Sequence, residues 1–373
     1  MSEPILLTPG PLTTSASVKQ AMLRDWGSRD TAFIAMNKAL RQRLPALANA
    51  QGTHVCVPVQ GSGTFAVEAT IGTLLPKAGK LLVLVNGAYG SRMVKIASVM
   101  GRTVEAIEWP EDKPVEAHAV DRRLAEDTSI THVAVVHCET TSGILNPIEA
   151  VAQVVEHHKR HLLIDAMSAF GALPLDARHV PFTALMASSN KCLEGVPGMS
   201  FAIIRKDALE ASANNAHSLS LDLYAQWKGF EANDQWRFTP PTHVIAAFVQ
   251  ALDEHEAEGG VAGRGARYAA NHRILVKGME EMGFRCLLPH ALQAPIITTF
   301  HMPADQAFVF ATFYDQLRDK GFAIYPGKLT VADSFRIGCI GHLGAPEMQA
   351  ALSAIRTTLA EMGVATGAPS LAA

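Results

Sequence analysis

Three segments of the sequence carry residue types that could do chemistry together. In the first, residues 59–64 (Val-Gln-Gly-Ser-Gly-Thr), an apolar run leads into glycines and hydroxyl residues ahead of a helix-like stretch. Glycines let a backbone approach an anion closely, and a helix N-terminus offers free N–H groups and a positive dipole. The lysine of a nucleoside-triphosphate loop is missing. The turn therefore predicts a phosphate cup, the alternative being a plain strand-to-helix turn.

The other two segments each place one ionisable residue at the end of an apolar run. Asp165 closes the run 162–166, and an acid at the carboxyl end of a parallel strand faces the crevice where α/β folds bind ligands. The alternative is a turn or helix N-cap aspartate. Lys191 follows the run 183–188 and precedes a glycine-containing turn. Most lysines are solvated, but one held in a cleft would have a lowered pKa, and its neutral amine could form an imine.

A phosphate cup, a strand-end aspartate and a sheltered lysine are together what pyridoxal phosphate requires. The cup anchors the phosphate, and the lysine holds the aldehyde. The carboxylate keeps the pyridine nitrogen protonated, so that the ring can accept electrons from a substrate carbon. The conjunction predicts pyridoxal phosphate as the cofactor and Lys191 as the catalytic residue.

The elements that must position these residues alternate along the chain. Apolar, strand-like runs at 55–60, 81–85, 103–108, 132–138, 161–166, 183–188 and 199–205 are interleaved with helix-like stretches at 64–75, 89–100, 118–127 and 147–158. This alternation predicts an α/β fold with a mostly parallel sheet wrapped by helices.

From residue 241 onward the pattern changes to that of a smaller α+β domain. Helices are expected at 241–258, 264–282, 305–320 and 346–362, and strands at 295–300, 322–325 and 334–339. We expect an N-terminal segment over residues 1–15, a large cofactor-binding domain over 16–260, a small C-terminal domain over 261–364 and a flexible tail over 365–373.

Composition argues against several other classes of protein. The 373 residues are 48% hydrophobic and 18% charged, with a formal net charge of −3, so no basic excess indicates a nucleic-acid partner. The apolar runs are far shorter than the roughly 20 residues that span a bilayer. No HExxH or paired His/Cys spacing suggests a metal site. Five irregularly spaced cysteines fit a reducing cytoplasm better than a disulfide framework.

The chain resembles the class V aminotransferases of fold type I in segments spread over about residues 5–360. These segments are residues 6–13, 60–68, 137–147, 191–199, 235–243, 325–329 and 335–341. Within that family they are most similar to enzymes that transfer the amino group of 2-aminoethylphosphonate to pyruvate. The resemblance implies a ping-pong reaction that gives phosphonoacetaldehyde and L-alanine in phosphonate catabolism. It also implies a homodimer with active sites at the subunit interface.

The resemblance further implies roles for individual residues. Lys191 would hold the cofactor and move a proton, Asp165 would pair with the pyridinium, and Tyr89 would stack on the ring unless it is an ordinary core or surface tyrosine. The other expected cofactor-binding residues are Ser62, Gly63 and Thr64 at the phosphate, Thr140 at the ring hydroxyl, Asn190 beside the lysine, and Thr239 reaching the phosphate of the neighbouring subunit.

Arg336, Gly10 and Arg29 are the expected substrate-binding residues. Arg336 lies in an apolar strand-like run, and its planar guanidinium suits a carboxylate and a phosphonate alike. The alternative is a solvated charge at a sheet edge. Arg29 stands where related enzymes often carry an aromatic residue. It is either a harmless variant or a second cation for the phosphonate.

Other functions are compatible with the same residues. An alanine– or serine–glyoxylate aminotransferase would use the same cofactor with a different amino donor. A noncatalytic binder of a phosphate ligand would keep the fold, yet it would need neither Lys191 nor Asp165. Cys192 and Cys339 might suggest a cysteine desulfurase, which shares the fold, but that enzyme needs its thiol on a mobile loop.

Overall fold

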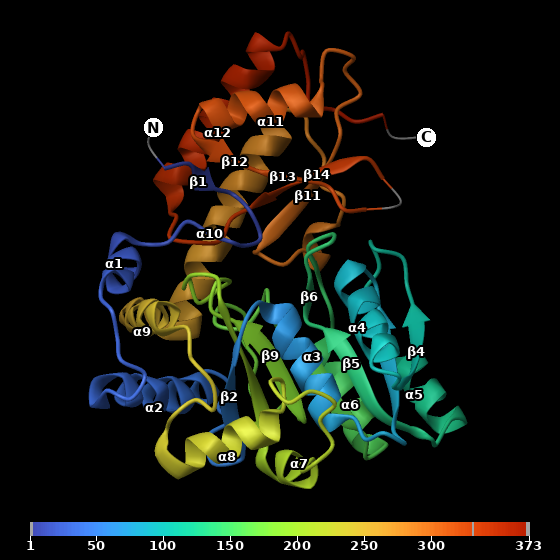
Figure 1. Ribbon diagram of the computed structural model, residues 1–373. Helices are drawn as coiled ribbons and strands as arrows, with labels where there is room; N and C mark the ends of the chain where they lie inside the picture. Colours follow the sequence, from blue (N-terminus) through green and yellow to red (C-terminus); the bar gives the residue numbers. More distant parts are fainter. Residues whose placement is uncertain (1–2, 330–331, 371–373) are drawn as a thin grey trace.

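A seven-stranded sheet organises the larger part of the computed structural model, which describes residues 3–329 and 332–370 (Figure 1). Among the described strands of this sheet only β10 runs antiparallel to its neighbours, so the predicted mostly parallel α/β sheet is confirmed. From edge to edge the order is β2 (His54–Gln60), β10 (Met199–Arg205), β9 (Ala184–Ser188), β8 (His161–Asp165), β5 (Ile130–Val136), β3 (Lys80–Val85) and β4 (Thr103–Glu108).

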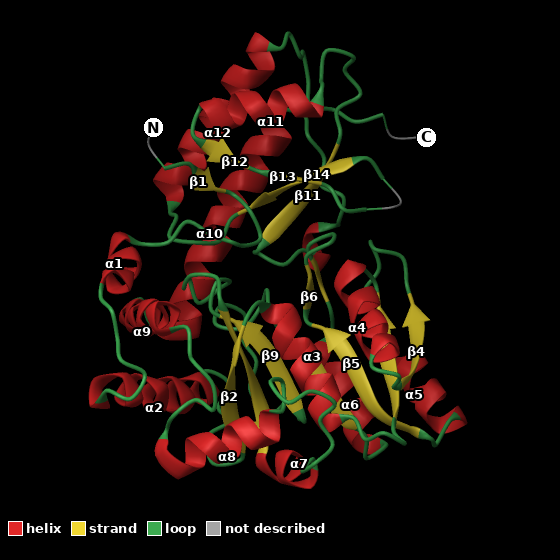
Figure 2. Cartoon of the chain, viewed as in Figure 1, coloured by secondary structure: helices red, strands yellow, loops and turns green. Residues whose placement is uncertain are grey.

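Helices cover both faces of the sheet, and the strands are therefore apolar on both faces (Figure 2). In β5, Val133 and Val135 pack into one core whereas Ala134 and Val136 pack into the other, as the period of two in a strand requires. Side chains of four helices pack into the first core: α2 (Thr31–Ala46), α5 (Ala117–Glu126), α6 (Ile148–His157) and α9 (Thr242–Ala257). Side chains of four other helices pack into the second core: α3 (Gly63–Leu74), α4 (Ala88–Val99), α7 (Lys206–Ala211) and α8 (Leu223–Asn233).

A second, three-stranded sheet and its helices form the upper part of Figure 1. The strands are antiparallel in the order β11 (Ile297–His301), β14 (Ser334–Gly338) and β13 (Tyr325–Pro326). A third core of aromatic and aliphatic residues packs them against α10 (Gly260–Glu281), α11 (Phe310–Asp319) and α12 (Ala345–Glu361). The N-terminal segment joins this part, because β1 (Ile5–Leu6) pairs in parallel with β12 (Phe322–Ala323) and Leu7 enters the same core.

Several element boundaries differ from the sequence-based predictions. Helix α10 begins at Gly260, directly after the left-handed Gly259, so the glycine pair ends α9 without adding a linker. Helix α11 begins at Phe310 rather than 305, because Asp305 first closes a turn by accepting the N–H of Ala307. The predicted run 132–138 divides into β5 and β6 (Cys138–Glu139), and β6 forms a hairpin with β7 (Ile144–Leu145). Helices α1 (Ala16–Gln20), α2, α7 and α8 were not predicted.

The predicted flexible tail is held in place over its first residues. The N–H of Ala365 donates to Asp305 at 2.8 Å, and the N–H of Gly367 donates to the carbonyl of Met282 at 2.9 Å. Residues 371–373 of the predicted tail lie outside the described residues. In the part of the chain that the structure describes, no helix combines the length and apolarity needed to cross a membrane, and no cluster of three metal-ligating side chains occurs.

Candidate active site

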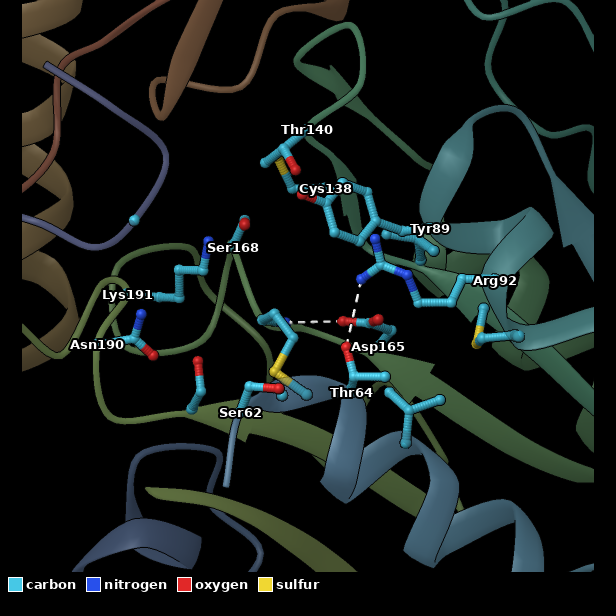
Figure 3. A pocket seen from close by; sticks show the side chains of 17 residues that line it. Ser62, Thr64, Tyr89, Arg92, Cys138, Thr140, Asp165, Ser168, Asn190 and Lys191 are labelled. Atoms are coloured by element: carbon cyan, nitrogen blue, oxygen red, sulfur yellow. Dashed lines mark hydrogen bonds between the residues drawn. The ribbon is translucent and has the colours of Figure 1, made fainter. Parts of the chain in front are cut away.

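The loops that follow several parallel strands meet at one edge of the large sheet and enclose a cavity of about 300 Å³ (Figure 3). The carboxyl edge is where open α/β sheets bind their ligands, because the loops leaving the strands diverge there. The cavity lining includes Gly10, Ser62, Gly63, Thr64, Tyr89, Thr140, Asp165, Asn190 and Lys191. The structure thus brings together most of the residues that the sequence predicts for cofactor and substrate binding.

The start of α3 forms one wall of the cavity and has the features of an anion cup. Ser62 is the N-cap residue, yet its hydroxyl makes no capping hydrogen bond to the helix. The first N–H groups of a helix have no carbonyl of their own helix to bond, so they are available to a ligand. A Cβ at Gly63 would lie 2.5 Å from Sδ of Met167, so a larger residue there would have to displace that flexible side chain.

Asp165 ends strand β8 and is only 5% exposed. Its Oδ1 accepts a hydrogen bond from the N–H of Met167 at 3.0 Å. Asp165 therefore also closes a turn, which is the alternative role that the sequence suggests for it. Burial raises the pKa of Asp165 to about 6, and the opposing effects of the Met167 hydrogen bond and of the charges on Lys191 and Arg92 are smaller. A positive charge placed beside this carboxyl group would lower its pKa and favour the carboxylate.

Lys191 lies in the turn after β9, with its amine in the cavity wall (Figure 3). The amine donates a hydrogen bond to the carbonyl of Pro9 in the N-terminal segment. Desolvation by burial lowers the pKa of Lys191, which increases the fraction of neutral, nucleophilic amine. Gly10 lies against this side chain, because a Cβ at Gly10 would come within 2.7 Å of Cδ of Lys191.

The loop that carries Lys191 is held by charged residues of α10. Glu194 adopts a left-handed conformation with a φ of 57° and is 2% exposed. Its Oε1 accepts a hydrogen bond from Nη2 of Arg267 at 2.8 Å. Nη1 of Arg264 donates to the carbonyl of Cys192 at 2.6 Å. Because a left-handed non-glycine residue costs free energy, these buried contacts are what keep the loop in this shape.

Arg336 lies in the middle of β14 and is 2% exposed, so it is not a solvated charge at a sheet edge. Its Nη1 donates to the carbonyl of Thr140 at 2.7 Å, and its Nε donates to the carbonyl of Pro326 at 3.1 Å. These carbonyls satisfy part of a guanidinium that its apolar neighbours alone would leave unpaired. Arg336 is not among the residues that line the cavity, but it lies directly behind Thr140, which does.

Two predicted residues lie away from the cavity of this chain. Thr239 is exposed in the segment between α8 and α9, and Arg29 is exposed in the turn before α2. Neither lines the cavity. The roles expected for both residues, including the action of Thr239 on a neighbouring subunit, therefore stay predictions.

Comparison with known proteins places this arrangement in a family. The model of the class-V aminotransferase family matches residues 15–333. The chain belongs to the class-V aminotransferases. The 2-aminoethylphosphonate–pyruvate transaminase of Pseudomonas putida strain F1 is 56% identical over 361 residues, which are 97% of this chain and 98% of that protein.

Solved structures of class-V aminotransferases and related enzymes share the fold. The ureidoglycine–glyoxylate aminotransferase of Bacillus subtilis superposes with a TM-score of 0.90 at 20% identity, covering 98% of this chain and 95% of that one. A phosphoserine aminotransferase from Trichomonas vaginalis with pyridoxal phosphate bound superposes with a TM-score of 0.77 at 18% identity, covering 94% of this chain and 99% of that one. At these identities the likeness establishes the fold alone.

Sequence reasoning missed several residues of this aminotransferase cavity, of which Arg92 is the most informative. Its guanidinium carbon lies 4.8 Å from the ring centroid of Tyr89, and its Nη1 donates to Oγ1 of Thr64 at 3.3 Å (Figure 3). The spacing of three residues between Tyr89 and Arg92 on one helix places both side chains on the same face. The other residues missed are Val67, Met93, Val136, Cys138, Met167, Ser168 and Ser188.

The cysteines near the site are buried and protonated. Burial raises the pKa of Cys192 to about 12 and raises that of Cys339 further. Both residues are 0% exposed. Because the thiolate is the reactive form of cysteine, neither residue has the exposed, mobile thiol that a cysteine desulfurase would need. Cys138 lines the cavity, and burial raises its pKa well above the usual value as well.

Proposed function

We propose that this aminotransferase transfers the amino group of 2-aminoethylphosphonate to pyruvate, giving phosphonoacetaldehyde and L-alanine by a ping-pong mechanism. The observation that carries the proposal is the convergence of Lys191, Asp165 and the N-terminus of α3 on one cavity. The substrate pair is supported by the relatives, of which the one from Pseudomonas putida F1 aligns over nearly the full length of both chains.

The residues around the cavity fit pyridoxal phosphate. Ser62, Gly63 and Thr64 offer an anion cup, and Asp165 offers a buried carboxylate for the ring nitrogen. Tyr89 and Thr140 line the same cavity and supply an aromatic face and a hydroxyl. When bound, the cofactor supplies an aldehyde that condenses with amines and a ring that accepts electrons from the adjacent carbon.

Lys191 holds the cofactor and then moves the proton of the reaction. When the substrate amine displaces it, the freed Nζ stays in the cavity wall, where its lowered pKa keeps a neutral fraction available. That amine takes the proton from the amine-bearing carbon of the substrate. It would then deliver that proton to the former aldehyde carbon of the cofactor, so that hydrolysis would release phosphonoacetaldehyde and leave the amino group on the cofactor. In the second half of the cycle Lys191 moves a proton in the opposite sense, and alanine leaves.

Arg336 is proposed to bind the phosphonate in the first half-reaction and the carboxylate of pyruvate in the second. A guanidinium stays charged in a buried site, and its planar fork accommodates either anion. Its hydrogen bonds to the backbone carbonyls of Thr140 and Pro326 fix the orientation of the guanidinium. Since it lies behind Thr140, we infer that the substrate acid reaches it along that wall, with Gly10 allowing the approach.

Arg336→Gln is expected to reduce kcat/KM for both 2-aminoethylphosphonate and pyruvate by about 10²-fold, because a buried anion then lacks its charged partner. Most of this decrease in kcat/KM should come from a higher KM rather than from a lower kcat. The measurement is steady-state kinetics with each substrate varied in turn. A simple alkylamine without an acid group serves as the control donor in the first half-reaction, and its rate should change little. Equal losses for the alkylamine and the phosphonate would contradict an acid-binding role.

The choice of amino donor distinguishes this function from that of an alanine– or serine–glyoxylate aminotransferase. The purified protein should form alanine from pyruvate with 2-aminoethylphosphonate as the donor. It should form little glycine from glyoxylate with serine or alanine as the donor. If only the glyoxylate reaction proceeds, the proposed substrate pair is wrong while the aminotransferase mechanism stands.

Arg29→Trp is expected to leave the preference for 2-aminoethylphosphonate over alanine as a donor unchanged within about twofold. Arg29 is exposed and lies outside the cavity, so its charge is screened from a ligand there. The ratio of kcat/KM values for the two donors is the measurement. A shift of tenfold or more would instead assign Arg29 to the phosphonate.

We also propose that the active unit is a homodimer in the cytoplasm. Phe65 and Phe238 are each 49% exposed and border an apolar depression beside the start of α3. A second copy covering this face would bring its Thr239 toward the phosphate cup. The described cysteines form no disulfide, and four of the five are buried, which suits a reducing compartment. Light scattering of the purified protein tests the dimer directly.

A further inference from the structure

The buried carboxylate of Glu139 has no part in the mechanism above, yet it lies where two elements of the cavity meet. Glu139 is 0% exposed and belongs to β6, the first strand of the β6–β7 hairpin. The hairpin follows β5 and leads Thr140 into the cavity wall. A buried charge is costly unless it is fully hydrogen-bonded, so its partners indicate what it does.

Within the described residues, both oxygens of the Glu139 carboxylate accept hydrogen bonds. Its Oε2 accepts the N–H groups of Tyr89 at 3.2 Å and of Gly90 at 3.3 Å. Its Oε1 accepts the N–H of Thr141 at 3.1 Å and the hydroxyl of Thr141 at 2.6 Å. A protonated carboxyl would direct its own O–H at one of these donors. The two N–H groups at Oε2 and the positive end of α4 favour the ionised carboxylate, whereas burial raises the pKa of Glu139.

The hairpin supplies the cap that α4 lacks in its own sequence. The N-cap residue of α4 is Gly87, which has no side chain to accept the first N–H groups. Oγ1 of Thr141 accepts the N–H of Ala88 at 2.9 Å, and Glu139 accepts the next two. Gly87 also makes room, since a Cβ there would lie 2.5 Å from Cγ of Glu139. Glu139 and Thr141 thus cap a helix that begins about fifty residues earlier in the chain.

This cap joins two parts of the wall that would contact a bound cofactor ring. Helix α4 carries Tyr89 and Arg92, and the hairpin carries Thr140. The carbonyl of Thr140 also accepts the hydrogen bond from Arg336. We propose that Glu139 is a positioning residue that fixes Tyr89 and Thr140 relative to each other around the cofactor ring. The inference rests on the proposed use of pyridoxal phosphate, but not on the identity of the amino donor.

Glu139→Gln tests the inference because it keeps the shape of the side chain and replaces one acceptor oxygen by an NH₂ group. That group would face an N–H donor, and a buried donor left unpaired disturbs the local geometry. The dissociation constant of pyridoxal phosphate from the apoprotein should rise about tenfold. The visible circular dichroism of the bound cofactor should change as well, because it depends on how the ring is held. Thr141→Val removes the hydroxyl alone and should produce a smaller change in the same direction.

Val155→Ala is the matched control for a general loss of stability. Val155 is 1% exposed in α6 and does not line the cavity. Its truncation should lower the melting temperature while leaving the cofactor affinity and the dichroism as in the wild type. In a double-mutant cycle, Glu139→Gln and Thr141→Val should be non-additive, because they disturb one network.

The inference is overturned if Glu139→Gln and Thr141→Val both bind the cofactor as tightly as the wild type and give the same dichroism. That result would leave the proposed transaminase intact. The inference is also overturned if Val155→Ala weakens cofactor binding as much as Glu139→Gln at an equal loss of melting temperature. A wild-type protein that binds no pyridoxal phosphate would instead overturn the proposed function itself.

Discussion

Lys191→Ala is expected to lower kcat for the transamination of pyruvate by about 10⁴-fold or more. The variant would lose the proposed covalent hold on the cofactor and the proposed base that moves the proton, and general acid–base catalysis alone contributes about 10²–10⁴-fold. The methyl side chain leaves the cavity open, so cofactor and substrate can still enter. The measurement is the rate of alanine formation from 2-aminoethylphosphonate and pyruvate.

Borohydride reduction supplies a check that does not depend on turnover. In the wild type, reduction should bleach the visible band and leave a pyridoxyl adduct on Lys191, located by mass spectrometry of peptides. The adduct should be missing in Lys191→Ala. Lys206→Ala is the matched control, since that lysine begins α7 at the far end of β10 and should retain full activity. An adduct on another side chain would contradict the assignment of Lys191.

Asp165→Asn is expected to reduce kcat by about 10³-fold with much less effect on folding. Removing one partner of a buried charge pair costs about 3–5 kcal/mol, and here the lost partner is the carboxylate proposed to keep the ring nitrogen protonated. The amide retains the size of the side chain and an oxygen for the N–H of Met167. The single-turnover rate with 2-aminoethylphosphonate should fall, whereas the melting temperature should change little.

The pH dependence of cofactor binding gives Asp165 a second signature. With its pKa raised to about 6 by burial, the carboxyl group of the apoprotein gains a proton as the pH falls through that value. Affinity for pyridoxal phosphate should therefore weaken below about pH 6 by more in the wild type than in Asp165→Asn. The variant also serves as the control for titration of the cofactor's own groups. Parallel pH profiles would contradict the proposed pairing.

The parts of the site that could be predicted from sequence are those set by local order along the chain. Asp165 and Lys191 directly follow apolar strands, and Gly63 opens a helix, so the rule that parallel strands end at one edge brings them together. The alternation of strands and helices likewise predicts the sheet. Helix α2 was missed, because its charged side chains alternate with apolar ones and a proline stands near its end, which weakens the helical pattern.

The rest of the site depends on contacts between distant segments, and no local pattern encodes these. The fit of Gly10 against Lys191 joins residues that lie far apart in the chain. The carbonyls that hold Arg336 come from Thr140 and Pro326, and carbonyls have no sequence signature. To predict that Arg92 lines the cavity, one would have to know how α4 is rotated about its axis. Thr239 is expected from the family resemblance and Arg29 from a departure from it, and the geometry of a single chain does not bring either to the cavity.

The N-terminal segment has a consequence for how the protein matures on the ribosome. Its strand β1 pairs with β12, the N–H of Gly338 donates to the carbonyl of Leu7, and Pro9 and Gly10 then contact Lys191. Residues 5–10 thus depend on partners that are synthesised much later. The large sheet can form while synthesis continues, but the pocket around the lysine is completed only after residues 322–338 have emerged. Acquisition of the cofactor is therefore expected to follow the synthesis of these residues.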